Sequence, residues 1–142
     1  MVIRRMEVGD VKEVGAIQER ITKSEVTGDF LDIIREYAIK PDNACFVAEH
    51  EGRVVGFMIS SILSGVFGAE KSAWIAILGV DPKFMGRDIG RALAREIFAF
   101  YRERGIKHIY TSVRWDSTDL LSFFKTLGFD RSNFINLRRV LD

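Results

Sequence analysis

The spacing of apolar residues near the N-terminus predicts one strand and two helices. Residues 2–8 alternate weakly between apolar and polar side chains, as a half-exposed strand does. Apolar residues then recur at three- and four-residue spacing over residues 11–21, and Asp10 precedes them as a helix cap. A second apolar stripe follows Asp29 and ends before Pro41. We therefore expect a strand followed by two amphipathic helices.

Three apolar runs in the middle of the chain predict three strands. ACFVAEH (44–50) and VVGFMISSIL (54–63) are joined by Glu51-Gly52-Arg53, which favours a hairpin. The glycines and serines of residues 64–72 predict a loop. AWIAILGVD, residues 73–81, is almost continuously apolar, which predicts a central strand buried on both faces.

The last third of the chain contains the clearest helical pattern. Apolar residues from Ile89 to Phe100 recur at helical spacing, and Gly105 is a good stop signal. We further expect a strand over residues 107–114, a helix over residues 117–127 and a last strand, FINLRRVL, over residues 134–141.

The predicted order of elements is β-α-α-β-β-β-α-β-α-β. It favours an α/β (α+β) fold, in which a mixed, mainly antiparallel central sheet carries helices on both faces. A length of 142 residues suits one domain spanning the whole chain, residues 1–142.

Composition and charge narrow the class of protein. A hydrophobic share of 47% and a charged share of 29% are typical of a soluble globular domain. The net charge of +1 lacks the basic excess of a nucleic-acid binder. No apolar run is long enough to span a bilayer, and the N-terminus lacks the apolar region of a signal peptide. With Cys45 as the one cysteine, we expect a buried structural thiol in a cytoplasmic protein.

VDPKFMGRDIGRAL, residues 80–93, has the pattern of a strand end, a glycine loop and a helix start. Such a junction presents backbone N–H groups to an anion, and the helix N-terminus adds a partial positive charge. Gly86 and Gly90 would let a ligand approach the backbone, although two glycines at this spacing also suit a plain turn. No Lys-Ser/Thr follows Gly90 and no G-x-G is present, so this is neither a Walker loop nor a dinucleotide fingerprint.

Asp88 lies within this loop and can act in two ways. As the N-cap of a helix starting at Ile89, its carboxylate would compete with a phosphate for the same N–H groups. Alternatively it points to solvent, with Arg87 and Arg91 offsetting its charge. In either case we expect weakened rather than abolished anion binding.

The order of elements and two motifs resemble the GNAT N-acetyltransferase family over nearly the whole chain. Residues 75–82 resemble the family's strand and Pro-containing turn, and residues 85–90 resemble its Gln/Arg-x-x-Gly-x-Gly/Ala loop. Residues 113–117 and 123–129 resemble its Val-x-x-Asp-Asn and Phe-Tyr-x-x-Leu-Gly-Phe segments. Met85 stands where the family has Gln or Arg, and Asp88 replaces the first motif glycine.

The resemblance implies acetyl-CoA as co-substrate and a primary amine, of a small molecule or a protein, as acceptor. The amine would attack the thioester directly, with the carbonyl polarised by a backbone N–H near residues 78–80. The residues implied to bind the cofactor are Leu78, Gly79, Val80, Met85, Gly86, Arg87, Asp88, Ile89, Gly90, Arg91, Ser117 and Phe124.

The family's usual acid and base have no counterpart here. Ala76 stands where the family often has Glu, and Phe124 where it often has Tyr, so we assign no catalytic residue. Tyr110 and Ser112 are candidate substitutes that alternation places on one strand face, against their interpretation as ordinary strand residues. An acceptor amine of low pKa would need no strong base.

Two further functions compete with the enzyme. One is a non-catalytic acyl-CoA-binding or sensing module, which the replaced acid and base favour. The other is a structural domain without cofactor, which Met85 and Asp88 favour. Measuring turnover distinguishes the binding module from the enzyme. Measuring cofactor binding distinguishes the structural domain from both the module and the enzyme.

The partners can be predicted only as classes. Acidic groups in the loops at residues 22–29 and 64–72 suit a cationic amine, although solvated loop charges are common. His50 and His108 form no ligand-spacing motif, so no metal site is expected. An exposed last strand over residues 134–141 would favour a homodimer.

Overall fold

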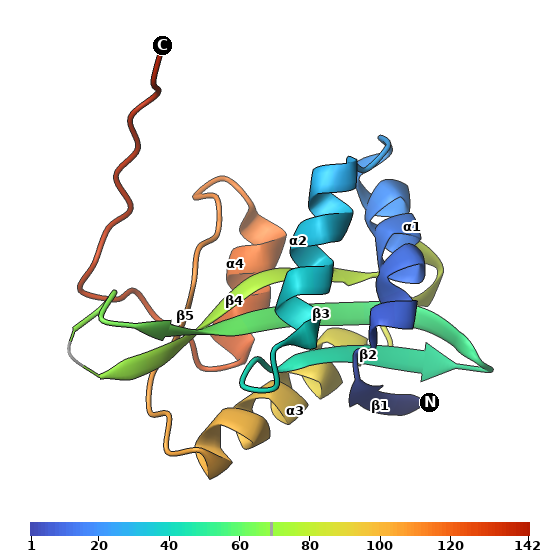
Figure 1. Ribbon diagram of the computed structural model, residues 1–142, viewed down its shortest axis with the longest axis horizontal. Coiled ribbons are helices and arrows are strands. Elements are labelled where there is room, and N and C mark those ends of the chain that lie inside the picture. Colours follow the sequence, from blue (N-terminus) through green and yellow to red (C-terminus); the bar gives the residue numbers. More distant parts are fainter. Residues whose placement is uncertain (69) are drawn as a thin grey trace. The chain divides into compact units, whose positions relative to one another are not determined.

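The computed structural model describes residues 1–68 and 70–142, and within them it contains five strands and four helices (Figure 1). Two 3₁₀ turns, Val8–Asp10 and Pro82–Phe84, precede α-helices in the chain. The elements are β1 (Val2–Arg5), α1 (Val11–Thr22), α2 (Gly28–Ile39), β2 (Cys45–His50), β3 (Arg53–Ser64), β4 (Lys71–Val80), α3 (Ile89–Glu103), β5 (Ile109–Thr111) and α4 (Thr118–Thr126).

The five strands form one sheet in the order β1-β2-β3-β4-β5. Neighbouring strands are antiparallel except β4 and β5, which are parallel. A parallel pair needs a crossover connection, and α3 supplies it between β4 and β5. The predicted mixed, mainly antiparallel sheet is confirmed.

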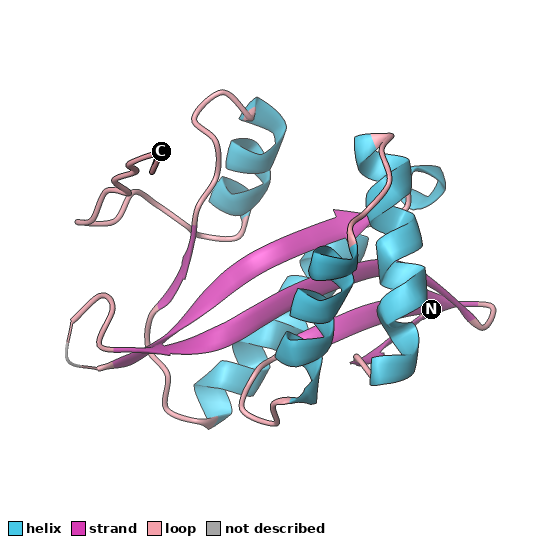
Figure 2. Ribbon diagram, turned by 45° about the horizontal axis from the view of Figure 1, so that its top comes forward, coloured by secondary structure: helices cyan, strands magenta, loops and turns pink. Residues whose placement is uncertain are grey.

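Helices cover both faces of this sheet. α1 and α2 lie side by side on one face, and α3 lies on the other (Figures 1 and 2). The core beneath α1 and α2 contains Val14, Ile17 and Ile34 of these helices and Val47, Phe57 and Ile59 of the sheet. On the opposite face, Ile89, Leu93 and Ile97 of α3 are buried, as the helical spacing predicted.

The most buried strand is β3, and the prediction that residues 73–81 form the central, doubly buried strand is wrong. Residues 54–60 of β3 are all buried, whereas β4 has several half-buried positions. The reason lies in the neighbours of each strand. Long strands flank β3 on both sides, but β5 pairs with β4 only along residues 73–75.

The second helix begins earlier than predicted. α2 starts at Gly28 rather than after Asp29, because Thr27 caps it. The Thr27 hydroxyl oxygen accepts a hydrogen bond from the Phe30 amide at 3.0 Å. This bond satisfies one of the amides that have no partner within the helix.

Asp10 precedes α1 as predicted, but it does not cap that helix with its side chain. Its carboxylate accepts hydrogen bonds from both terminal nitrogens of Arg4 at 2.8 Å and from the Glu7 amide at 2.7 Å. Burial alone would raise the pKa of Asp10, but these hydrogen bonds and the charge of Arg4 outweigh it and lower that pKa. The residue therefore ties β1 to the 3₁₀ turn.

The chain divides into two compact units, residues 1–112 and residues 113–142. The sheet with α1, α2 and α3 forms the first unit, and α4 with the C-terminal segment forms the second. Of the loop predicted at residues 64–72, position 69 lies outside the described residues.

The predicted last strand over residues 134–141 is wrong. Within the described chain these residues form no strand, and Ile135 and Leu137 are 83% and 87% exposed. Their alternating pattern suits a strand, but a strand exists only where a neighbouring strand pairs with its backbone groups. Local alternation in a sequence does not supply that neighbour.

Candidate functional site

β4 changes its neighbours half-way along its length. Residues 73–75 pair with β3 on one side and with β5 on the other. From Ile77 to Val80, the strand pairing among the described residues is with β3 alone. The register shifts at Ile59/Ser60, so that Ala76 has no residue opposite it in β3. A bulge of this kind re-aims backbone groups, and beyond Ile75 no strand of the described chain pairs with the outer edge of β4.

Asp81 fixes the end of β4 and the start of the loop that follows. Its amide donates to the Val55 carbonyl at 2.8 Å, and its own carbonyl accepts from the Phe84 amide at 2.8 Å. One carboxylate oxygen accepts from the Lys83 amide at 3.0 Å. The other oxygen forms an ion pair with Arg20 of α1 at 3.0 Å. The side chain of Asp81 is only 6% exposed, so this position is strongly constrained.

Two loop residues adopt the left-handed backbone conformation. Gly86 has φ +82°, and a Cβ there would meet nothing within 4 Å, so the backbone and not a lack of space requires glycine. Asp88 has φ +59°, a conformation that Asp tolerates better than most residues and that glycine adopts at the lowest cost. This gives a physical reason for the glycine that the family pattern has at position 88.

Asp88 occupies the N-cap position of α3, and of the two arrangements that the sequence left open the structure has the one in which the carboxylate does not cap the helix. Its carboxylate makes no capping hydrogen bond and is exposed; only its carbonyl joins the helix, accepting from the Ala92 amide at 3.0 Å. The amides of Ile89, Gly90 and Arg91 have no partner within an α-helix, and the Asp88 side chain takes none of them. The start of α3 therefore keeps its donors and its positive dipole end for an anion.

The side chains around these amides differ in what they can offer. Arg87 places its guanidinium 4.9 Å from the centre of the Phe84 ring, which holds a positive charge at the loop. Met85 is 69% exposed. Ile89 is 2% exposed, and a Cβ on Gly56 would lie 2.8 Å from its Cγ2, so Ile89 is a core residue that offers a ligand only its amide.

Gly79 is required by packing. A Cβ at this position would lie 2.8 Å from the Ile21 Cδ1 atom and 2.8 Å from two ring atoms of Phe57. The end of α1 thus packs directly on the backbone of β4 beside the loop. Leu78 and Val80, on either side, are half-buried, and all three residues pair with β3.

The second predicted motif lies in residues 113–142, which form their own unit. Ser117 is the N-cap of α4 but makes no side-chain capping bond. Phe124 is 5% exposed. Its ring packs edge-to-face with the rings of Phe123 and Phe129, with 5.3 Å and 5.1 Å between the ring centres. Of the predicted cofactor residues, positions 78–80 and 85–91 lie together in the first unit, whereas Ser117 and Phe124 lie in the second.

The candidate substitutes for acid and base do not share one strand. Tyr110 lies in β5, and its ring stacks on the Phe67 ring with 4.2 Å between the ring centres. Ser112 follows the last residue of that strand. The shared face of Tyr110 and Ser112 therefore stays a prediction, and the ring of Tyr110 belongs to an aromatic stack.

Sequence reasoning missed the link between Arg20 and Asp81. An Asp before Pro at a strand end is a signal for a turn closed by its side chain, which could have identified Asp81. No local pattern marks Arg20, because its partner is distant in the chain.

The buried thiol predicted at position 45 is confirmed. Cys45 is 1% exposed, its thiol donates to the Ser60 carbonyl at 3.4 Å, and burial raises its pKa. No cluster of metal-ligating side chains occurs in residues 1–68 and 70–142. Every helix in these ranges is too short or too polar to cross a membrane.

A sequence model of the Acetyltransferase (GNAT) family matches residues 12–129. The chain belongs to this family. It is 32% identical over 93 residues to the mycothiol acetyltransferase of Amycolatopsis mediterranei, a match that covers 63% of this chain and 31% of the relative. It is 36% identical over 105 residues to the N-alpha-acetyltransferase RimI of Mycobacterium tuberculosis, covering 74% of this chain and 61% of RimI. The GNAT chain thus spans less than two thirds of either relative.

The fold is also found in solved acetyltransferases. The aminoglycoside acetyltransferase AAC(6')-Iy, in complex with the bisubstrate analogue CoA-S-monomethyl-acetylneamine, has a TM-score of 0.82 and 16% identity. The match covers 99% of this chain and 98% of that one. At this identity the similarity shows the GNAT fold alone, and it agrees with the predicted arrangement of sheet and helices.

Proposed function

We propose that this GNAT chain is an acetyl-CoA-dependent N-acetyltransferase acting on a primary amine of a small molecule or a protein. The observation that carries the proposal is that two backbone segments of the described chain are open on one side: the edge of β4 beyond residue 75, where β5 no longer pairs, and the start of α3, where no side chain caps the amides. The first segment leads into the second along the chain. An acyl-CoA has the matching parts in the same order: a thioester and amide-containing arm, then a pyrophosphate.

We assign the cofactor contacts by chemistry. The backbone of Leu78, Gly79 and Val80 would bind the pantetheine arm, in the manner of an added strand. The amides of residues 86–91 would bind the pyrophosphate, with the charges of Arg87 and Arg91 nearby. The residues Met85, Asp88 and Ile89 would contribute to cofactor binding through their backbone in the loop and not through their side chains. Ser117 and Phe124 belong to the proposal through the second family motif. The family match spans parts of both units, which supports one catalytic domain over residues 1–142.

The proposed reaction needs no side-chain base on this strand. The amine nitrogen attacks the thioester carbon, and the developing oxyanion is stabilised by a backbone N–H of residues 78–80. The C–S bond then breaks, and the thiolate takes up a proton while the amine loses one to solvent. Because the Phe124 ring has no proton to donate, the leaving thiolate takes its proton from solvent. Since Ala76 has no basic group to deprotonate the acceptor, we expect the acceptor to arrive with its amine uncharged. The rate is therefore expected to rise with pH through the pKa of the acceptor amine.

The test has two stages. Acetyl-CoA and CoA are first titrated into the protein by calorimetry, and thiol release from acetyl-CoA is then followed with a panel of small amines and peptides. Binding together with amine-dependent thiol release supports the enzyme. Binding without turnover on any amine supports the alternative, a non-catalytic acyl-CoA-binding or sensing module, which the side chains of Ala76 and Phe124 favour. Absence of binding contradicts both.

We also propose a homodimer and a cytoplasmic location. The large apolar side chains of Ile135, Leu137 and Leu141 are all more than 80% exposed, and a second copy would cover them. Sedimentation at increasing protein concentration tests this, because a species of one-chain mass at every concentration would contradict the dimer. The one cysteine, buried and unable to form an internal disulfide, suits a reducing compartment.

A further inference from the structure

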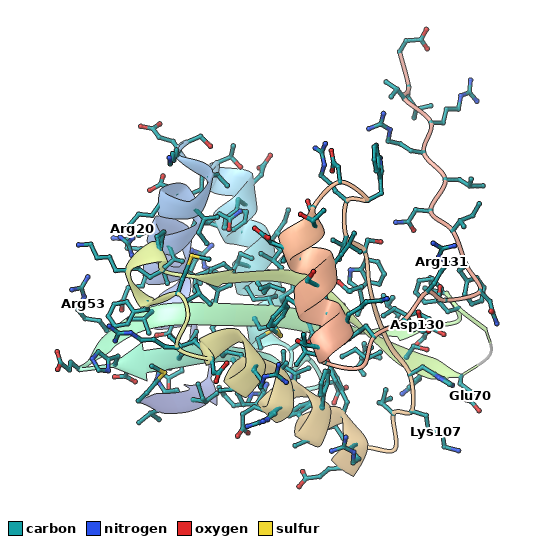
Figure 3. The ribbon with its side chains drawn as sticks, turned by 180° about the vertical axis from the view of Figure 1, so that it is seen from behind. Arg20, Arg53, Glu70, Lys107, Asp130 and Arg131 are labelled. Atoms are coloured by element: carbon teal, nitrogen blue, oxygen red, sulfur yellow. The ribbon has the colours of Figure 1, made fainter. Side chains whose placement is uncertain are left out.

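The link between Arg20 and Asp81 joins α1 to the loop that begins the proposed pyrophosphate site. Arg20 lies in the last turn of α1, and Figure 3 shows it beside the segment that follows β4. Its Nη2 atom lies 3.0 Å from the Asp81 Oδ2 atom, whereas Asp81 Oδ1 accepts from the Lys83 amide. The carboxylate thus has one partner for each oxygen: a backbone group within the loop and a cation from outside it.

The ion pair between Arg20 and Asp81 also changes the charge that an anionic ligand would meet at this loop. The segment proposed to receive a polyanion carries two carboxylates, Asp81 and Asp88. The carboxylate of Asp88 is exposed, and water screens its charge. The carboxylate of Asp81 is 6% exposed, so its field would act on a nearby phosphate with little screening if it were unpaired. The positive charge of Arg20, 3.0 Å from the Asp81 carboxylate, neutralises this negative charge.

We propose that Arg20 is a positioning residue for the phosphate-bearing half of acyl-CoA. It holds the Asp81 carboxylate so that the turn keeps its shape, and it neutralises that carboxylate so that the loop remains attractive to a pyrophosphate. The inference rests on the proposed acyl-CoA site, and it adds a residue of α1 that acts through Asp81.

The fold does not depend on Arg20, which makes the inference testable. The side chain of Arg20 is 44% exposed, and Asp81 has three hydrogen bonds, to Val55, Lys83 and Phe84, that do not involve Arg20. The neighbouring Ile21 contacts the backbone at Gly79, which holds the end of α1 on β4 without the ion pair. Arg20→Ala should therefore fold.

The experiment compares acetyl-CoA with S-acetylpantetheine, which has the same thioester arm and no pyrophosphate. Arg20→Ala should weaken CoA binding in calorimetry roughly tenfold, the size expected for the loss of a charge-assisted pair. It should raise KM for acetyl-CoA by a similar factor with kcat nearly unchanged, and leave kcat/KM for S-acetylpantetheine unchanged. Arg20→Lys, which keeps the charge, should recover most of the affinity.

A matched control and a second substitution separate charge from shape. Arg53 is an exposed arginine at the same end of the sheet (Figure 3), and it has no ion pair among the described residues. Arg53→Ala removes the same charge from the molecule and should leave CoA affinity within about twofold. Adding Asp81→Asn to Arg20→Ala removes the unpaired carboxylate and should restore part of the lost affinity.

The outcomes distinguish the inference from the proposed function. If the unaltered protein binds acetyl-CoA and Arg20→Ala binds it as Arg53→Ala does, the inference is wrong and the proposed function stands. An equal loss with acetyl-CoA and S-acetylpantetheine also overturns it, because that pattern indicates a general distortion. If the unaltered protein binds no acetyl-CoA, both are wrong.

Discussion

At its N-terminus α3 presents amides that no side chain caps, whereas near its C-terminus the buried hydroxyl of Tyr101 is hydrogen-bonded within the chain. Tyr101, in the last turn of α3, is 2% exposed. Its hydroxyl accepts from the Ala44 amide at 3.1 Å and shares a 2.7 Å hydrogen bond with the Ser60 hydroxyl. The comparison teaches where to look for a ligand: the donors that no side chain caps lie at the end of α3 that is proposed to bind an anion.

The backbone at the C-terminal end of α3 is also hydrogen-bonded within the chain. At the C-terminus Gly105 has φ +75° and its amide donates back to the Arg102 carbonyl at 3.1 Å. The Arg104 guanidinium donates to the Phe100 carbonyl at 3.0 Å and lies 3.5 Å from the centre of the Phe100 ring. The carbonyls of Phe100, Tyr101 and Arg102 near this end are thus satisfied locally.

The largest expected effect is on stability at the C-terminal end. Tyr101→Phe leaves the fully buried Ala44 amide without its acceptor, which costs about 1–3 kcal/mol of unfolding free energy. Urea denaturation measures this loss, and Tyr37→Phe, at a half-buried tyrosine of α2, is the control. CoA affinity should not change in Tyr101→Phe. A variant that keeps full stability would show that the hydroxyl does not serve the Ala44 amide.

The next effect is on cofactor affinity at the N-terminal end. Gly86→Val forces a branched residue into the left-handed region at φ +82°, at a cost of about 1–2 kcal/mol. Acetyl-CoA should bind about 5- to 30-fold more weakly by calorimetry, because the loop amides move. Gly86→Asn, which tolerates this conformation, should lose clearly less. Equal losses for Val and Asn would indicate that glycine is needed for space and not for conformation.

A smaller effect of opposite sign is expected at Asp88. Asp88→Gly removes a negative charge beside the uncapped amides. The interaction free energy of a charge with a helix end is about 0.3–1 kcal/mol. Acetyl-CoA should therefore bind about two- to fivefold more tightly, most clearly at low salt. Asp88→Asn separates the two causes, since it removes the charge and keeps a residue that tolerates φ +59°. Weaker binding of both variants would mean that the carboxylate itself assists the ligand.

The smallest effect concerns alkaline pH. Burial raises the pKa of Tyr101, and its hydrogen bonds with Ser60 and Ala44 offset only part of that rise. The raised pKa contributes stability that is fully present below the ordinary tyrosine pKa of about 10 and is lost as the pH rises toward the folded value. Urea midpoints between pH 9 and pH 11 should fall more steeply for the unaltered protein than for Tyr101→Phe. Parallel slopes would contradict a raised pKa.

Much of the fold was predictable because its signals are local. The stripe from Ile89 to Phe100 and the stop at Gly105 describe α3 almost to the residue, since a helix repeats within one turn. The glycines of the loop were recognisable for the same reason, because a left-handed residue or an anion-binding turn is encoded in a few neighbours. Residues 134–141 mark the limit, because their alternation predicted a strand that has no partner strand.

The sequence by itself determined the order of elements, the family pattern and the position of the glycine loop. Only the tertiary structure decided that β3 is the buried strand, that the Asp88 carboxylate leaves the α3 amides uncapped, and that Arg20 reaches Asp81. The physical reason is the same in each case. Helical and strand periods are set by residues a few positions apart, whereas burial, pairing and the direction of a charge depend on segments that meet only when the chain has folded.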